Sequence, residues 1–145
     1  MTIEEAIAKL QTLKPHQYTD EMLVRWLSDL DRKIWYEVIR RYEDTAIEED
    51  YDEDGELITD MPEPEAYEME EGTGGAPDTV PDVTLIVPEP YSDMYIKYLA
   101  MQIDYWTGDI SRYNNSLVVF NAAYASFVDC FNRIKTHKKD VYILI

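Results

Sequence analysis

The sequence is poor in the residues that carry most enzyme chemistry. It has one cysteine, Cys130, and two histidines, His16 and His137. A single cysteine excludes an internal disulfide, which fits a reducing compartment. Neither histidine has neighbours that would indicate a catalytic triad or a metal cluster, and a lone cysteine in a helical pattern is more often a small apolar residue than a nucleophile. We therefore expect no enzymatic activity and no cofactor.

Glycine-rich loops and long apolar runs are also missing. Gly72, Gly74 and Gly75 lie among acidic residues that would repel a phosphate group. No apolar run approaches the roughly 20 residues that a membrane span needs. The first five residues include two acidic ones, Glu4 and Glu5, and lack the apolar centre of a signal peptide. We expect a protein that is made and used in a cytoplasm, without contact to a membrane.

Basic residues are absent from one long stretch of the chain. The net charge is -17, from 13 basic and 30 acidic residues. Positions 43–96 hold 19 acidic residues and no Lys or Arg, so the remainder holds 11 acidic and 13 basic residues, a balance of +2. Nucleic-acid binding through a general surface needs clustered Lys and Arg. That class of function is therefore excluded.

Apolar residues at helical spacing predict a mainly α fold, a four-helix bundle-like single domain over 1–145. Thr2 and Glu5 form a capping box for the first helix, and Pro15 ends it. Gly108 ends the third helix, and the short link after it predicts an antiparallel hairpin with the fourth. The expected helices span about 2–12, 20–42, 93–106 and 109–135.

The segments between and after these helices have other patterns. Residues 43–81 predict a long acidic loop, because like charges repel and apolar residues are few. Val83–Val87 has the composition of a strand, and Leu57–Thr59 could form a weaker second arm of a hairpin.

A C-terminal extension, 135–145, is basic and then β-forming, so we expect a strand over 140–145. Its partner is either the strand of residues 83–87 or the sheet edge of another chain. The expected partner-binding residues are Val141, Tyr142, Ile143, Leu144 and Ile145.

One stretch of the acidic loop matches the start of an EF-hand calcium site. The possible ligands are Asp50, Asp52, Asp54, Glu56 and Asp60, with a glycine at the sharp turn. The twelfth position should be a bidentate Glu and is Met61 instead. An acidic loop that binds divalent ions weakly is the alternative reading of the same residues.

The tyrosine and asparagine content has two readings: protein contacts, or a core that uses tyrosine together with an exposed helix face that tolerates polar residues. The chain has 12 tyrosines, whose large apolar body and polar tip suit interfaces as well as cores. Asparagine is unfavourable inside helices because its side chain competes for backbone groups, yet several occur in the expected fourth helix. The residues expected to be exposed for subunit contact are Tyr95, Tyr98, Arg112, Asn114 and Asn115.

Several strings of the sequence resemble the head-tail connector (adaptor, or head-completion) proteins of tailed bacteriophages and prophages. The resemblance covers roughly residues 10–42 and 85–134, and the acidic insertion at 43–81 departs from it. The strings are Leu13–Tyr18, Leu23–Asp31, Val87–Asp93, Tyr98–Leu99, Gln102–Trp106, Gly108–Asp109, Arg112–Ser116 and Phe120–Tyr124.

The resemblance implies a structural subunit of the virion neck, assembled in the host cytoplasm. Such subunits form a ring, commonly of twelve copies, between the portal and the next neck or tail protein. DNA passes through the ring without specific binding. Two other functions are compatible with the composition: an acidic DNA-mimic inhibitor of a DNA-binding enzyme, and a calcium-responsive binding module.

Overall fold

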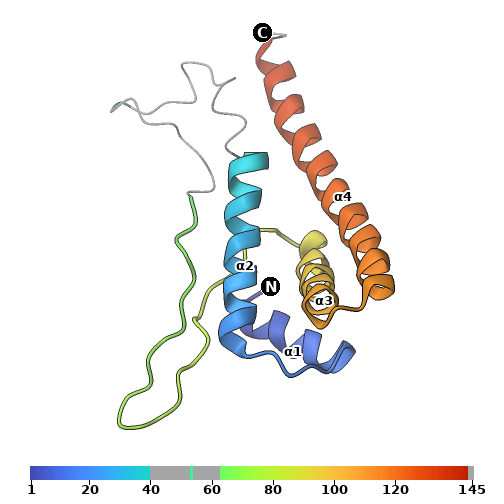
Figure 1. Cartoon of the computed structure of the whole chain (residues 1–145). Helices are drawn as coiled ribbons and strands as arrows, with labels where there is room; N and C mark the ends of the chain where they lie inside the picture. The colour runs from blue at the N-terminus through green and yellow to red at the C-terminus, as the bar shows by residue number, and fades with distance from the viewer. Residues whose placement is uncertain (40–52, 54–62, 144–145) are drawn as a thin grey trace.

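The described part of the chain is built mainly from four α-helices. A computed structural model describes residues 1–39, 53 and 63–143, with side chains as far as residue 133. A π-helical turn, Trp35–Ile39, continues the second helix, and a 3-10 turn, Tyr91–Asp93, precedes the third. The helices are α1 (Ile3–Leu13), α2 (Asp20–Ile34), α3 (Met94–Thr107) and α4 (Ile110–Ile143) (Figure 1). The predicted mainly α fold is confirmed.

Local signals in the sequence account for most helix ends. The Thr2 hydroxyl accepts from the Glu5 N–H at 3.2 Å, and the Glu5 carboxylate accepts from the Thr2 N–H at 3.4 Å, which confirms the capping box. The Thr19 hydroxyl accepts from the Met22 N–H and caps α2. Gly108 ends α3 with a φ of 84°, a left-handed conformation that favours glycine.

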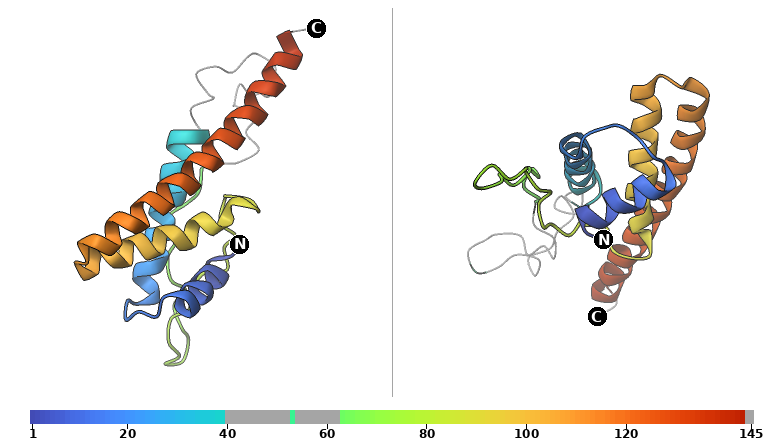
Figure 2. Two further views of the ribbon diagram at one scale, coloured as in Figure 1. Left: turned by 90° about the vertical axis from the view of Figure 1, so that its right-hand side faces the viewer. Right: turned by 90° about the horizontal axis from the view of Figure 1, so that it is seen from below.

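The helices pack around α3. α3 and α4 form the predicted antiparallel hairpin, and α1 and α2 both contact α3. α4 is much longer than its partner, so its C-terminal half extends beyond α3 (Figures 1 and 2). Leu10, Leu27, Leu30 and Leu99 are among the fully buried side chains of one apolar core, which Phe120 and Phe127 complete from α4.

The chain between α2 and α3 is extended and carries only isolated β-bridges in its described part. Thr84 pairs with Thr2, where the Ile3 N–H donates to the Val83 carbonyl at 3.0 Å. Glu70 pairs with Thr79 in the same antiparallel manner. Residues 63–81 run along the side of α2 that faces away from α3 and α4 (Figures 1 and 2). We call residues 63–81 the acidic ribbon.

The expected C-terminal strand is wrong for residues 140–143, which are the last residues of α4. No Gly or Pro interrupts the chain from Ile110 to Ile143. Extending a helix adds one local hydrogen bond per residue, whereas a strand needs the edge of another strand. Residues 83–87 therefore do not pair with this segment, and their bridge is to the N-terminal residues. Leu57–Thr59, Leu144 and Ile145 lie outside the described residues.

Candidate functional site

A buried carboxylate joins three helices near the α3–α4 turn. Asp104 of α3 is 3% exposed and forms an ion pair with Lys14, which follows the last residue of α1. Its second oxygen accepts from the hydroxyl of Ser116, on α4, at 2.5 Å. A buried charge is tolerated when a counter-ion and hydrogen bonds compensate its desolvation. Asp104 therefore fixes how α1 and α4 sit against α3.

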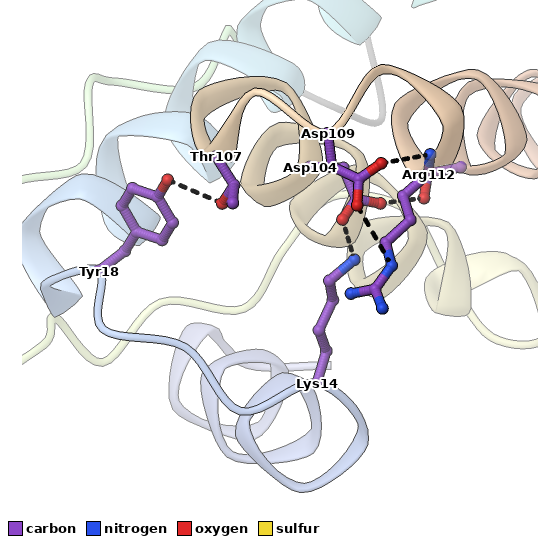
Figure 3. A network of polar contacts seen from close by, with 7 residues as sticks. Lys14, Tyr18, Asp104, Thr107, Asp109 and Arg112 are labelled. Atoms are coloured by element: carbon purple, nitrogen blue, oxygen red, sulfur yellow. Dashed lines mark hydrogen bonds and ion pairs between the residues drawn. The ribbon is translucent and has the colours of Figure 1, made fainter.

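Polar contacts continue around the turn itself (Figure 3). The Asp109 carboxylate caps α4 by accepting from the Arg112 N–H at 3.1 Å, and it also pairs with the Arg112 side chain at 3.4 Å. The hydroxyls of Tyr18 and Thr107 lie 3.1 Å apart, which links the α1–α2 connection to the end of α3. These contacts make the turn a defined unit and not a loose connection.

A second buried carboxylate holds the returning chain against α2. Asp31 is completely buried and accepts from the hydroxyls of Tyr67 and Tyr95, each at 2.5 Å. The backbone N–H of Ile86 donates to the same carboxylate at 3.3 Å. Asp31, on α2, therefore binds three separate parts of the chain at one point: Tyr67 of the acidic ribbon, Ile86 of the segment before α3, and Tyr95 of α3.

Burial shifts the titration of this cluster. Desolvation raises the pKa of Asp31, and the hydrogen bonds from Tyr67, Tyr95 and Ile86 oppose that rise. Desolvation together with the nearby Asp31 charge raises the pKa of both tyrosines. The two hydroxyls therefore stay protonated as donors at neutral pH. The cluster is a structural latch between α2, α3 and the chain that connects them.

The acidic ribbon offers negative charge to solvent. It holds no Lys or Arg, and its carboxylates Glu63, Glu65, Glu68, Glu70, Glu71 and Asp78 are all exposed. Glu63 accepts from the Tyr36 hydroxyl at 2.5 Å. Among the ion pairs of residues 1–39 and 63–133, none involves a ribbon carboxylate. The ribbon is therefore an anionic surface toward solvent.

The outward side of α4 lacks charge over a long distance. Residues 113–128 contain no Asp, Glu, Lys or Arg, and they extend about 24 Å along the helix axis. We call the exposed residues of this stretch the uncharged face: Asn114, Asn115, Val118, Val119, Asn121, Ala122, Ala125 and Ser126. The other side packs inward through Phe120 and Phe127. Solvent-facing sides of surface helices normally carry charged residues, so this face has the composition of a contact surface.

Large apolar side chains are also exposed where α3 meets α4. Tyr105, Trp106 and Ile110 are 57%, 58% and 75% exposed. The Tyr105 ring contacts those of Trp106 and Tyr113, with centroids 5.4 Å apart in each case. Together they give the turn a small aromatic surface next to the uncharged face.

The residues expected at subunit contacts divide into two groups. Arg112, Asn114 and Asn115 are exposed on α4, as expected. Tyr95 is 0% exposed, so its expected role on the surface is wrong. Its hydroxyl donates to Asp31 and accepts from the Val87 N–H, and this buried pairing draws the ring inward.

Tyr98 lies between these two groups. It is half-buried, with its ring 5.2 Å from that of Phe120, and its hydroxyl accepts from the Gln102 amide. Burial raises the pKa of its hydroxyl. Tyr98 therefore contributes mainly to the α3–α4 contact.

Other expected sites fall partly or wholly outside the described residues. The possible calcium ligands Asp50, Asp52, Asp54, Glu56 and Asp60 are among the positions that the structure does not describe. Val141, Tyr142 and Ile143 belong to the end of α4, and His137 lies in the same helix.

The remaining histidine and the cysteine both have neighbours. The His16 ring accepts from the Tyr18 N–H at 3.1 Å. Cys130 is half-buried, and its hydrogen bond with Tyr91 raises the pKa of that tyrosine.

Sequence reasoning missed the two buried carboxylates. Asp31 and Asp104 each sit next to an apolar residue of an inward-facing helix stripe, Leu30 and Ile103. An acidic residue placed on the apolar side of a helix is the signal that could have found them, because such a residue must be compensated. Their partners Tyr67, Tyr95 and Lys14 are too distant in sequence to be identified by spacing.

Within residues 1–39, 53 and 63–143, no group of three or more His, Cys, Asp or Glu side chains could hold a metal ion. None of the helices in that part of the chain is long and apolar enough to cross a membrane.

Comparison with known proteins gives no relative. No protein-family model, no curated protein and no solved structure matches this chain.

Proposed function

We propose that this chain is a head-tail connector subunit of a tailed bacteriophage. It forms a ring of about twelve copies under the portal, joins the head to the neck or tail, and extends the DNA channel. The role is structural and non-enzymatic. Its partners are copies of itself, the portal protein and the next neck or tail protein.

The observation that carries the proposal is where the resembling strings meet in space. Leu13–Tyr18, Gln102–Trp106, Gly108–Asp109 and Arg112–Ser116 are separate in sequence, yet they all supply residues to the network around the α3–α4 turn. Strings that resemble one family and also build one contiguous unit support a shared helical body more strongly than scattered matches would.

The distribution of charge supports a conduit. The acid-rich segment 43–81 is proposed to project from the ring as a loop, into the lumen or toward a partner. Negative walls repel phosphate and let DNA pass without being held. The same charge could belong to a DNA mimic, but such an inhibitor needs carboxylates spread over a folded surface. Here 19 of the 30 acidic residues fall between positions 43 and 96.

The test is assembly with the portal. The purified chain is measured by multi-angle light scattering, alone and after mixing with the portal protein of the same virus. A complex that contains about one chain per portal subunit is the expected result. A chain that ignores the portal and instead inhibits a DNA-handling enzyme in stoichiometric amounts would overturn the proposal in favour of the mimic.

A further inference from the structure

The uncharged face of α4 is flanked by charges of both signs at each of its ends. The face extends about 24 Å along the helix, with small side chains such as Ala122 at its centre. Asp109 and Arg112 precede it, and Asp129 and Arg133 follow it. The order along the helix is therefore negative, positive, uncharged, negative, positive. The centres of protein interfaces are depleted in charged residues, so this pattern is that of an interface with charged ends.

The charges at the two ends are accessible to a partner. The Arg112 side chain is 73% exposed, and it holds the Asp109 carboxylate beside it at 3.4 Å. Arg112 lies on the same edge of the helix as the exposed Val119, seven residues later. Asp129 and Arg133 are exposed near the other end. In the part of the chain whose side chains are described, no ion pair includes either of these two residues.

The same face of a second copy, running in the opposite direction, presents the complementary order of charge. An antiparallel pair brings Arg112 of each copy to Asp129 of the other when its two-fold axis crosses α4 between residues 120 and 121. Bringing Asp109 of each copy to Arg133 of the other places the axis at residue 121. Both pairs of opposite charges therefore give the same register to within about 1 Å. A parallel pair would instead set Arg112 against Arg112 and Asp129 against Asp129.

The exposed side chains near this axis suit contact with their own copies. Ala122 is small, so two helices can approach to the short end of the usual separation of about 8–10 Å. Asn121 lies next to the axis, and its amide carries both donors and an acceptor, so two copies of it can hydrogen-bond to each other. Val118 and Ala125 lie about one turn to either side of the axis, where the valine of one copy meets the alanine of the other.

We propose that the uncharged face of α4 binds the same face of a second copy in an antiparallel, two-fold pair, with Arg112 of each copy beside Asp129 of the other. The contact uses one surface twice, so it closes after two copies and does not extend into a ring. The inference therefore goes beyond the proposed function and does not depend on it. A single helix pair is small for an interface, so the pair should form and dissociate with protein concentration.

Charge reversal tests the pairing. Arg112→Glu and Asp129→Arg each set like charges against each other at both ends of the pair. Each variant alone should associate at least about tenfold more weakly than wild type at low salt, measured by sedimentation equilibrium over a range of protein concentrations. The double variant carries both changes in one chain, which restores opposite charges at both ends. It should recover association close to that of wild type.

Arg25→Glu is the matched control for these variants. Arg25 is also an exposed arginine that pairs with a carboxylate close to it in sequence, Glu21 at 3.7 Å, but it lies on α2. Arg25→Glu should therefore associate as wild type does. Thermal melting by circular dichroism checks that every variant folds.

Cysteine crosslinking tests the direction and register of the pair. In a Cys130→Ser background, Ala122→Cys places a thiol beside the two-fold axis, where its copy lies within the Cα separation of a disulfide, about 4.4–6.8 Å. The two copies of Ala125→Cys would lie about 12–14 Å apart along the helix. Oxidised glutathione should therefore crosslink the first variant and leave the second uncrosslinked, whereas a parallel pair would crosslink both.

The outcomes separate this contact from the proposed function. A wild-type chain that stays monomeric at all concentrations, a double variant that fails to recover association, or equal crosslinking at the two positions overturns the contact. Portal binding is measured separately and can be observed in each of these cases. Rings that form equally well with Arg112→Glu overturn the contact and support the connector. A pair that passes both tests, in a chain that ignores the portal, supports the contact and counts against the connector.

Discussion

The helical body and the acidic ribbon are adjacent in the chain but are held by different interactions. The body is stabilised by side chains with almost no exposure, such as Leu27 and Leu99, and by two buried carboxylates that join its helices. The ribbon contacts the body through Tyr67, Met69 and Val80, and its carboxylates face solvent. Burial therefore determines the shape of the body, while charge determines the surface of the ribbon.

The largest expected difference between the two parts is their response to truncation. Leu99→Ala removes a fully buried side chain from α3 and should lower the free energy of unfolding by about 2–5 kcal/mol, since it leaves a cavity. Glu68→Ala in the ribbon should change it by less than about 0.5 kcal/mol. Urea denaturation measures both. Equal losses would mean that the ribbon is as much a part of the cooperative unit as the helices.

Removal of the latch between the two parts should have an intermediate effect. Asp31→Ala leaves the hydroxyls of Tyr67 and Tyr95 buried without their acceptor, which should cost about 1–3 kcal/mol of unfolding free energy. Asp29→Ala is the matched control, because Asp29 is an exposed carboxylate on the same helix. Its urea midpoint should stay near wild type. A loss for Asp29→Ala as large as that for Asp31→Ala would contradict the role of the latch.

The same carboxylate predicts a dependence on pH. The pKa of Asp31 is raised above its ordinary 3.8 because burial disfavours the charged form. The folded state therefore binds this proton more tightly than the unfolded state does. The stabilisation that protonated Asp31 gives the folded state is fully present below about pH 3.8. It is lost as the pH rises through the pKa of Asp31 in the folded state.

Comparison with Asp31→Asn isolates this contribution. The difference in unfolding free energy between wild type and Asp31→Asn, measured by urea denaturation, should shift in favour of wild type as the pH falls from neutral into the acidic range. The other carboxylates titrate in both proteins, so their contributions to the unfolding free energy cancel in this difference. A difference that is flat with pH would show that Asp31 has the same pKa in both states.

The smallest expected effect compares two glycines with left-handed backbone. Gly108 ends α3 with a φ of 84°, and Gly75 turns the ribbon with a φ of 82°; a Cβ at either position would meet open space. Alanine at each costs about 1 kcal/mol of local strain. Gly108→Ala should lower the thermal midpoint, because the turn belongs to the body. Gly75→Ala should leave it unchanged, and a loss there would show that ribbon and body unfold together.

The sequence predicts the local part of this structure well. Apolar spacing, the Thr2–Glu5 capping box and Gly108 are signals that lie within a few residues of the helix ends they determine. The helices begin close to the positions that these signals predict. The strand expected over 140–145 failed because β-forming composition is a weak preference, and a continuing helix satisfies its backbone without a partner. Tyr95 was misassigned to the surface because its partner Asp31 is 64 positions away.

The ribbon is clamped where it leaves the body and where it returns. Tyr67 is held by Asp31 and Ser28, and Val83 and Leu85 are bonded to the first residues of the chain. For the chain between these two attachments, the free-energy cost of closing the loop rises only slowly with loop length, by about 0.6 kcal/mol for each doubling. We therefore expect the chain to tolerate insertion at residues 73–75, which are exposed. A peptide tag or a fluorescent domain grafted there would report on assembly while the helices keep their packing.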